Sequence, residues 1–330
     1  MTKHIEFNEY GSSSVLQYVP LEIKPPMQNE VQVQNKAVGV NFIDTYIRSG
    51  LYPVPSFPSG LGTEASGIVT QVGQNVADLK VGDRVVYAQA TLGAYSDYHN
   101  VNAEKVIKIP DSISFEQAAA SFLKGLTVYY LFYLTYPVKK DEVILFHAAA
   151  GGVGQIACQW ARALGVKLIG TAGSQEKVDL ALQKGAWQMI NYQTEDIAKR
   201  VSEITEGEKV NVVYDSVGQA TWLSSLDCLK PRGLMVSFGN ASGAVTGVDL
   251  GILNQKGSLF VTRPSLFGYL NNKADLQKAA TTLFELILNG SINVDVRESQ
   301  IYPLSKVKDA HNMLESRKTM GSLLLIPESH

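Results

Sequence analysis

The sequence predicts an α/β protein of two domains, a doubly wound parallel sheet accompanied by a β-rich, barrel-like domain. From residue 141 onward, six apolar strand candidates recur about every 20 residues, and helical segments separate the first five. Before that point, residues 1 to about 110 consist of short strand candidates broken by Gly, Pro, Asn and Asp. A chain of 330 residues is long enough for two domains of ordinary size.

The N-terminal part has the pattern of an irregular β domain. Residues 30–40 alternate in polarity, residues 65–73 are β-branched between glycines, and residues 81–86 form a turn that leads into a strand. Residues 110–134 then change to a helical period. Ser114 is the predicted N-cap of that helix, with a Glu or Gln close behind it.

The second part alternates strand and helix. The predicted strands are residues 143–146, 166–170, 187–190, 210–215, 234–238 and 258–262. The predicted helices are residues 153–164, 175–184, 194–205 and 219–229. Such alternation is typical of a parallel sheet that helices cover on both faces, and six strands suit a doubly wound dinucleotide fold.

The C-terminal tail changes pattern again. We expect a helix near 274–289, a short strand at 294–299 and a helix near 305–316, and we expect the tail to pack on the first domain. The predicted domains are residues 1–124 with 266–330, and residues 125–265.

Composition excludes several classes of protein. The hydrophobic fraction is 45%, the charged fraction is 18% and the net charge is −2, so no basic surface for nucleic acid is expected. The first residues carry no signal or targeting pattern, and no apolar run reaches the roughly 18 residues of a membrane span. The two cysteines cannot form a disulfide framework or a Cys-rich zinc site, which favours the cytoplasm.

The turn HAAAGGVG, residues 147–154, lies between a predicted strand and a predicted helix. Glycines at such a turn let the backbone approach a pyrophosphate, so we predict that Gly151, Gly152 and Val153 contact a dinucleotide in a Rossmann domain. Ala149 stands where the first glycine of the fingerprint is usual. Small residues at a close helix crossing are the alternative explanation.

The end of the second strand favours NADP over NAD. An NAD site usually has an acidic residue there, whereas this chain has Gly173 and Ser174 and no acid before Glu176. Glu176 is explained by its place in the first turn of a helix. Gly173 and Ser174 leave room for a 2′-phosphate, and Lys177 can supply positive charge. A solvated helix face is the alternative explanation for Lys177.

Loops that follow the fifth and sixth strands reach the same edge of the sheet as the glycine turn. Phe238, Gly239 and Asn240 follow one of these strands, and Pro264 and Ser265 follow the other. We therefore predict that these five residues also contact the cofactor.

Four segments carry a family resemblance: residues 38–50, 60–69, 81–85 and 141–162. Together they resemble the medium-chain dehydrogenase/reductase superfamily. Within it, the stretch DEVILFHAAAGGVGQIACQWAR is similar to the signature of the quinone oxidoreductase and zeta-crystallin family. The resemblance covers nearly the whole chain and implies a GroES-like barrel beside the Rossmann domain.

Further blocks resemble bacterial NADPH:quinone reductases of this family: KGLTVYY (124–130), VVYDSVG (212–218), VSFGN (236–240) and VTRPS (261–265). The resemblance implies NADPH as cofactor, with further contacts from Asn41, Phe42, Tyr46, Thr127, Tyr130, Tyr192, Ser216, Val217 and Arg317. An exposed edge tyrosine and a charged helix end are the alternatives for Tyr192 and Arg317.

The resemblance also implies the catalytic residues. Asn41, Tyr46 and Tyr52 occupy positions that the family places near the nicotinamide. The two tyrosines can stack on a quinone or donate a hydrogen bond, or they can simply pack at the rim of the barrel. Asp44 is expected to be a cap or turn residue.

Zinc-containing relatives carry a cysteine ligand and a Gly-His-Glu motif at positions that read Asn41 and Gly62-Thr63-Glu64 here. The five histidines show no ligand spacing, so no metal is predicted. Zinc stabilises a strongly basic alkoxide product, whereas a reduced quinone or an enolate is much less basic and needs no Lewis acid. A metal-free enzyme should therefore prefer quinones or activated alkenes to ketones.

The predicted function is NADPH-dependent reduction of a quinone. An NADPH-dependent alkenal or enone reductase is the alternative within the same class. A non-catalytic NADPH-binding protein, structural or regulatory, is the alternative from another class. The sixth strand, 258–262, would form an exposed sheet edge, so a homodimer through this edge is also expected.

Overall fold

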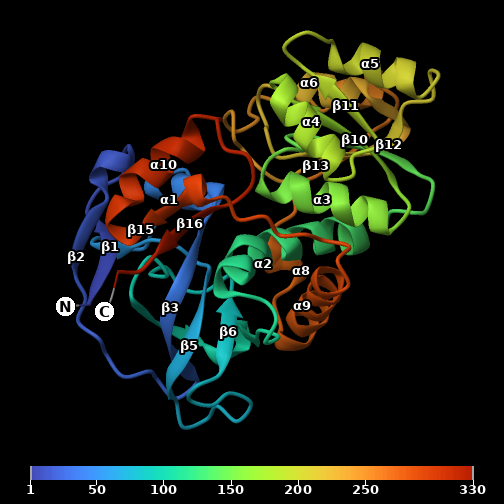
Figure 1. Cartoon of the computed structure of the whole chain (residues 1–330). Coiled ribbons are helices and arrows are strands. Elements are labelled where there is room, and N and C mark those ends of the chain that lie inside the picture. Colours follow the sequence, from blue (N-terminus) through green and yellow to red (C-terminus); the bar gives the residue numbers. More distant parts are fainter. Residues whose placement is uncertain (1, 329–330) are drawn as a thin grey trace. The chain divides into compact units, whose positions relative to one another are not determined.

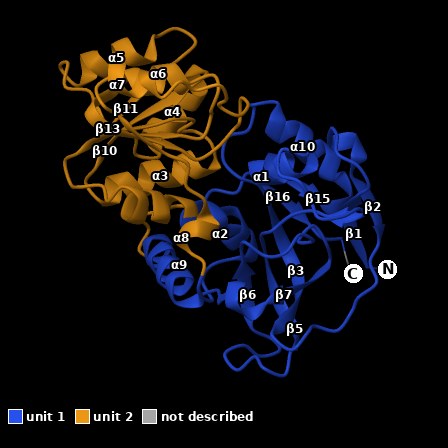
Figure 2. Ribbon diagram, turned by 180° about the vertical axis from the view of Figure 1, so that it is seen from behind, with its two compact units in different colours: residues 1–126, 272–288, 294–330 blue, residues 127–271, 289–293 orange. Residues whose placement is uncertain are grey.

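The computed structural model describes residues 2–328 of the chain (Figure 1). The chain divides into two compact units (Figure 2). Unit 1 comprises residues 1–126, 272–288 and 294–330, and unit 2 comprises residues 127–271 and 289–293. The C-terminal tail thus belongs mostly to unit 1, while residues 289–293 belong to unit 2.

Unit 2 is built on a six-stranded parallel sheet in the order β11-β10-β9-β12-β13-β14. The strands are β9 (Val143–Phe146), β10 (Lys167–Ala172), β11 (Gln188–Asn191), β12 (Val210–Asp215), β13 (Leu229–Ser237) and β14 (Phe260–Thr262). The helices are α3 (Gly152–Ala163), α4 (Gln175–Gln183), α5 (Ile197–Ile204), α6 (Trp222–Asp227), α7 (Gly251–Gln255) and α8 (Leu266–Tyr269). This order confirms the predicted doubly wound sheet.

The strand order determines how the helices are distributed. The chain runs outward from β9 to β11, then returns to β12 on the other side of β9 and runs outward to β14. Because parallel crossovers are right-handed, helices of the first run cover one face and helices of the second run cover the other. In agreement, α3 packs on α4, and α5 packs on α6. Buried aliphatic side chains such as Leu145, Ile169 and Val213 form the core beneath α5 and α6.

Unit 1 contains two sheets. One has three strands in the order β2-β1-β4, namely β1 (Lys3–Phe7), β2 (Gln17–Pro20) and β4 (Ser59–Gly60). The other has seven: β3 (Glu30–Val40), β5 (Ala65–Val72), β6 (Arg84–Tyr87), β7 (Tyr98–Asn102), β8 (Val106–Lys108), β15 (Ile301–Pro303) and β16 (Leu323–Ile326). The long strand β3 is central, because it pairs with β16, β5 and β7. This is the predicted β-rich domain.

Helices complete unit 1. They are α1 (Phe42–Arg48), α9 (Lys273–Leu288) and α10 (Val307–Glu315), with the short turns η1 (Ser13–Val15), η2 (Ala103–Lys105), η4 (Glu298–Gln300) and η5 (Leu304–Lys306). Helix α2 (Phe115–Tyr129) continues into the π-helical turn η3 (Tyr130–Thr135). The predicted N-cap is confirmed: the Ser114 hydroxyl accepts from the Gln117 N–H at 3.1 Å, and the Gln117 side chain accepts from the Ser114 N–H at 3.0 Å.

The strand predicted at residues 294–299 is wrong. These residues pair with no strand within 2–328, and the strand of this region is β15. The alternation that suggested a strand has another cause, since Val294 and Val296 pack against a small apolar cluster that contains Ala37 and Leu324. Within residues 2–328, no helix is both long and apolar enough to cross a membrane.

Candidate active site

The glycine-rich turn lies at the carboxyl end of β9, where it leads into α3. Gly151 is the N-cap of α3, and no side chain caps this helix at that position. A side chain on Gly154 would place its Cβ 2.4 Å from the carbonyl oxygen of Ala148, so only glycine lets α3 pack this closely on the turn. This is the role of the third glycine in a dinucleotide turn. The turn can therefore receive a pyrophosphate at the N-terminus of a helix.

The carboxyl end of β10 brings four predicted residues together. The Ser174 hydroxyl caps α4 by accepting from the Lys177 N–H at 3.3 Å. Lys177 is half-buried in the first turn of α4, and burial lowers the pKa of its ammonium group. A Cβ on Gly173 would lie 2.4 Å from the Tyr192 hydroxyl oxygen. Glycine at 173 therefore makes room for the Tyr192 ring, which the sequence could not reveal.

The loops after β12, β13 and β14 lie at the same edge of the sheet. Asp215, the last residue of β12, accepts from the N–H groups of Val217 and Gly218 at 2.7 and 3.0 Å. The Phe238 N–H donates to the carbonyl oxygen of Asp215 at 2.8 Å, so the loops that begin at Ser216 and Phe238 adjoin each other. Ser265 caps the short helix α8 through a bond from the Gly268 N–H at 3.3 Å.

Two predicted cofactor residues of unit 2 are buried side chains near the start of the unit. Tyr130 stacks on Tyr269, with ring centroids 5.2 Å apart and planes 15° apart. Burial raises the pKa of the Tyr130 phenol, so this phenol stays protonated and can only donate or accept a hydrogen bond. Thr127 lies one helical turn earlier and is buried as well.

In unit 1 the predicted catalytic residues lie around α1. Asn41 is the N-cap of this helix, and its side-chain amide donates to the Glu64 carboxylate at 2.8 Å. The rings of Tyr46 and Tyr52 meet edge to face, with centroids 5.5 Å apart, and the centroids of Phe42 and Tyr46 are 6.2 Å apart. Unit 1 therefore brings together the four predicted residues of this segment. Arg317 is exposed just after α10.

A chain of buried polar groups holds α1 in place. The Arg48 guanidinium donates to Nδ1 of His311 at 2.9 Å, and Nε2 of His311 lies 3.1 Å from the Tyr95 hydroxyl. That hydroxyl donates to Asp44 at 2.9 Å, and the same carboxylate oxygen accepts from the Asn41 N–H at 2.8 Å. Asp44 is thus a cap residue, as expected, and burial raises its pKa to about 7.

Sequence reasoning missed Glu64, which accepts from the Asn41 amide, and Lys124, which lies beside Glu64. Glu64 is fully buried and accepts from the Leu123 N–H at 2.6 Å in addition to the Asn41 amide. The Lys124 ammonium lies 3.9 Å from Glu64, and burial lowers its pKa. An acid within GLGTEASG, between small residues, was the available signal. No three His, Cys, Asp or Glu side chains in residues 2–328 are grouped as metal ligands.

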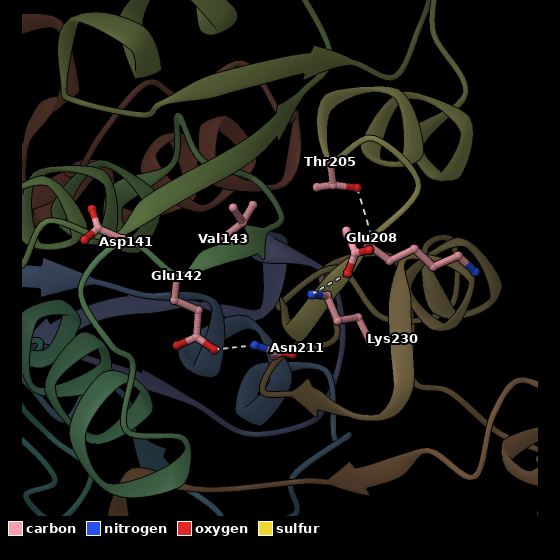
Figure 3. Close-up of a pocket in the computed structure, with 8 residues that line it drawn as sticks. Asp141, Glu142, Val143, Thr205, Glu208, Asn211 and Lys230 are labelled. Atoms are coloured by element: carbon pink, nitrogen blue, oxygen red, sulfur yellow. Dashed lines mark hydrogen bonds and ion pairs between the residues drawn. The ribbon is translucent and has the colours of Figure 1, made fainter.

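A cavity of about 310 Å³ opens at the opposite, amino-terminal edge of the sheet (Figure 3). Its lining includes Val143, the first residue of β9, and Asn211, the second residue of β12. The Asn211 amide donates to Glu142 at 2.6 Å, and Lys230 pairs with Glu208 at 3.4 Å. Dinucleotides bind at carboxyl ends of parallel strands, so this cavity is not the cofactor site.

Comparisons with known proteins agree with this arrangement. The family described as "Zinc-binding dehydrogenase" matches residues 152–286, and the "Alcohol dehydrogenase GroES-like domain" matches residues 27–111. These matches define a dehydrogenase/reductase of the two-domain, medium-chain class.

Quinone oxidoreductase 1 of Escherichia coli (strain K12) is 64% identical over 327 residues, which cover 99% of this chain and 100% of that protein. The crystal structure of Escherichia coli quinone oxidoreductase complexed with NADPH matches with a TM-score of 0.98 and 65% identity, covering 98% of this chain and 100% of that one. A 2-haloacrylate reductase of Burkholderia is 40% identical over 94% of both chains. The chain belongs to the quinone oxidoreductase family.

The buried His311 predicts a loss of stability in acid. Burial and the neighbouring Arg48 guanidinium lower the pKa of His311 to about 3, below its usual value of 6.5. Between these two pH values the unfolded chain binds a proton at this position and the native protein does not, so stability falls as the pH falls. Over the interval from pH 7 to pH 5, this difference in proton binding at His311 should lower the free energy of unfolding by about 2 kcal/mol.

Urea unfolding of the wild type and His311→Gln at pH 7 and pH 5 measures this contribution. The wild type should lose about 2 kcal/mol more than the variant over this interval. Equal losses in the two proteins would show that His311 is not held neutral in the native state.

Proposed function

We propose that this chain is an NADPH-dependent quinone reductase that transfers reducing equivalents from NADPH to a quinone without a metal ion. The observation that carries the proposal is near full-length similarity to a quinone oxidoreductase, combined with a glycine turn built as a dinucleotide site. We assign residues 1–124 and 266–330 to the substrate domain and residues 125–265 to the cofactor domain. NADPH would supply the hydride, and the chain would supply binding and orientation.

We assign NADPH to the carboxyl edge of the unit 2 sheet. The uncapped start of α3 suits the pyrophosphate, and Lys177 in the first turn of α4 suits the 2′-phosphate. The proposed contacts in unit 2 are Thr127, Tyr130, Gly151, Gly152, Val153, Gly173, Ser174, Lys177, Tyr192, Ser216, Val217, Phe238, Gly239, Asn240, Pro264 and Ser265. Those in unit 1 are Asn41, Phe42, Tyr46 and Arg317.

We propose that Asn41, Tyr46 and Tyr52 orient the quinone. The packed rings of Tyr46 and Tyr52 are half-buried and can offer an aromatic face or a phenol hydrogen. Asn41 is held rigidly because its backbone and its amide are each bonded to a buried carboxylate. A positioned acceptor needs little further help, because the anion of a reduced quinone is weakly basic.

A second candidate function is the reduction of activated double bonds. The relative named 2-haloacrylate reductase supports it, since a haloacrylate is an alkene conjugated to a carboxylate. The resulting charge would spread into an enolate, so this reaction also needs no Lewis acid. The two functions would share the cofactor site and differ in the acceptor pocket.

Steady-state NADPH oxidation against a panel of quinones, enals and ketones tests the proposal. Quinones should give the highest kcat/KM, and dialysis against a chelator should leave that rate unchanged because no metal takes part. A preference for enals would establish the second function, and a preference for ketones or a loss of activity with the chelator would contradict both. NADPH binding without oxidation by any acceptor would indicate a non-catalytic protein.

Replacing Lys177 tests the assignment of the 2′-phosphate. A charge-assisted contact is worth about 1.5–3 kcal/mol, so Lys177→Ala should raise the KM for NADPH about 10- to 100-fold. The KM for NADH should hardly change, and kcat should stay the same because the phosphate lies far from the transferred hydride.

The matched control is Lys199→Ala, which removes an exposed lysine from α5 and should alter neither KM. Equal weakening of both cofactors by Lys177→Ala would mean that Lys177 supports the loop rather than reads the phosphate.

We also propose a homodimer through the free edge of β14. Within residues 2–328, no strand pairs with the edge of β14 that faces away from β13. On this strand, Phe260 is 61% exposed and Val261 is 40% exposed. Such an edge is normally covered, and two-fold pairing with a second copy would cover it and close the assembly.

The buried free cysteines Cys158 and Cys228 fit a reducing compartment, so we propose that the protein is located in the cytoplasm.

Sedimentation at micromolar concentration tests the dimer. The wild type should show twice the chain mass of 35.9 kDa. Val261→Lys should shift the protein to the monomer, because a charged side chain at the pairing edge disfavours association. The control Val81→Lys, at an exposed turn of unit 1, should remain a dimer. A wild-type mass equal to that of one chain would refute the proposal.

A further inference from the structure

A network of buried side chains lies beneath the carboxyl edge of the unit 2 sheet, and no function described above uses it. It consists of Thr171, His147, Ser225, Asp215 and Thr221, which we call the switch-point network. The first four are at most 1% exposed, so none of these can touch a bound cofactor. Thr171 comes from β10, His147 follows β9, Asp215 ends β12 and Ser225 belongs to α6.

The donor and the acceptor of each hydrogen bond in this network can be assigned in turn, starting from Asp215. Ser225 and Thr221 both donate their hydroxyl hydrogens to the same oxygen of Asp215, at 2.7 and 2.6 Å. Because Ser225 has no second hydrogen, its oxygen must accept from Nε2 of His147, 2.9 Å away. Nδ1 of His147 is then an acceptor and takes the hydroxyl hydrogen of Thr171 at 3.0 Å. Of the two neutral tautomers, only this one gives both ring nitrogens a hydrogen-bond partner.

Each end of the network holds a segment assigned to the cofactor. At one end, the Thr171 hydroxyl accepts from the Ala148 N–H at 3.4 Å, and the Thr171 carbonyl accepts from the Ala149 N–H at 3.0 Å. These two residues begin the glycine turn. At the other end, Asp215 holds the N–H groups of Val217 and Gly218.

The network lies at the point between β9 and β12 where the order of the strands reverses. Strands β9 and β12 are neighbours, but the chain runs away from them to opposite sides. A crevice opens above such a pair of strands, and ligands of doubly wound sheets bind in it. Nδ1 of His147 contacts Thr171 of β10, and Nε2 contacts Ser225, which in turn bonds to Asp215 of β12. The imidazole therefore connects the two halves of the sheet beneath the crevice.

We propose that His147 is a positioning residue that couples the glycine turn to the loop 216–218, so that both segments are held in register for one dinucleotide. The inference rests on the proposed function, because it requires NADPH in this crevice. Burial lowers the pKa of His147 although Asp215 lies 4.0 Å from Nε2, so the imidazole stays neutral and its Nδ1 can accept from Thr171.

A double-mutant cycle with Thr171→Val and Ser225→Ala tests the coupling. Each change removes one hydroxyl beside a different nitrogen of His147 without adding bulk. By the usual value of one hydrogen bond, each should weaken NADPH binding about fivefold. The double variant should also be weakened about fivefold rather than 25-fold, since either change breaks the same connection. The dissociation constant is measured by NADPH fluorescence, independently of turnover.

The protein without cofactor provides a second readout. Thr171→Val should speed amide hydrogen exchange at Val217 and Gly218 at least threefold, although these amides bond to Asp215 and not to Thr171. The matched control is Ser224→Ala, next to Ser225 on α6, whose hydroxyl bonds to the backbone carbonyl of Thr221 and not to a side chain of the network. It should change neither exchange nor binding. His147→Gln keeps an acceptor and a donor and should bind NADPH better than His147→Phe, which keeps neither.

The outcomes separate the two proposals. If the wild type does not bind NADPH, the proposed function fails, while the exchange experiment still reports on coupling through His147. If the wild type binds NADPH but the two single effects multiply to about 25-fold, and exchange at 217–218 is unchanged in Thr171→Val, the coupling is refuted. The cycle and the exchange measurement need only Thr171→Val and Ser225→Ala, so they remain decisive even if His147→Phe does not fold.

Discussion

The candidate cofactor site depends on one constraint, the adjacency of β9 and β12 at the centre of a parallel sheet. Because the chain leaves these two strands toward opposite sides, the turn after β9 and the loop after β12 diverge and leave backbone N–H groups at one edge. The glycine turn, the end of β10 and the loop 216–218 follow from that adjacency. The cavity described above lies at the amino-terminal ends of β9 and β12, so it does not arise from the divergence of the loops that follow these strands.

Each unit contains a buried neutral histidine that accepts a hydrogen bond at Nδ1 and donates one at Nε2, within a series of hydrogen-bonded side chains. His311 accepts from Arg48 and faces Tyr95, and His147 accepts from Thr171 and faces Ser225. Each chain ends on a buried aspartate that holds backbone N–H groups of a proposed functional segment. A chain of directed hydrogen bonds of this kind favours one arrangement of its side chains, because reversing a bond leaves a further buried polar atom unpaired. Burial lowers the pKa of both imidazoles, and the Arg48 guanidinium lowers that of His311 further, so both rings stay neutral.

Local sequence patterns predicted most strands of the parallel sheet, whereas features that depend on contacts between distant residues could not be predicted. The strands at 143–146 and 210–215 match β9 and β12, because they are apolar runs bounded by clear turns. Strand β13 begins five residues before its predicted start, since Pro231 and Gly233 conceal a register shift. Residues 294–299 alternate as a strand does but only pack on a cluster. The partners of His147 lie 24 and 78 residues away in the chain, so no local pattern indicates that network.

The position of Tyr192 over Gly173 restricts how this protein could change its cofactor during evolution. A change of preference toward NAD is expected to place an acidic side chain at the end of the second strand of the sheet. Here even a methyl group at 173 would approach the Tyr192 hydroxyl to 2.4 Å. An acid at that position therefore requires the exposed Tyr192 side chain to move away from 173 or to be replaced by a smaller one, which couples the cofactor preference to residue 192.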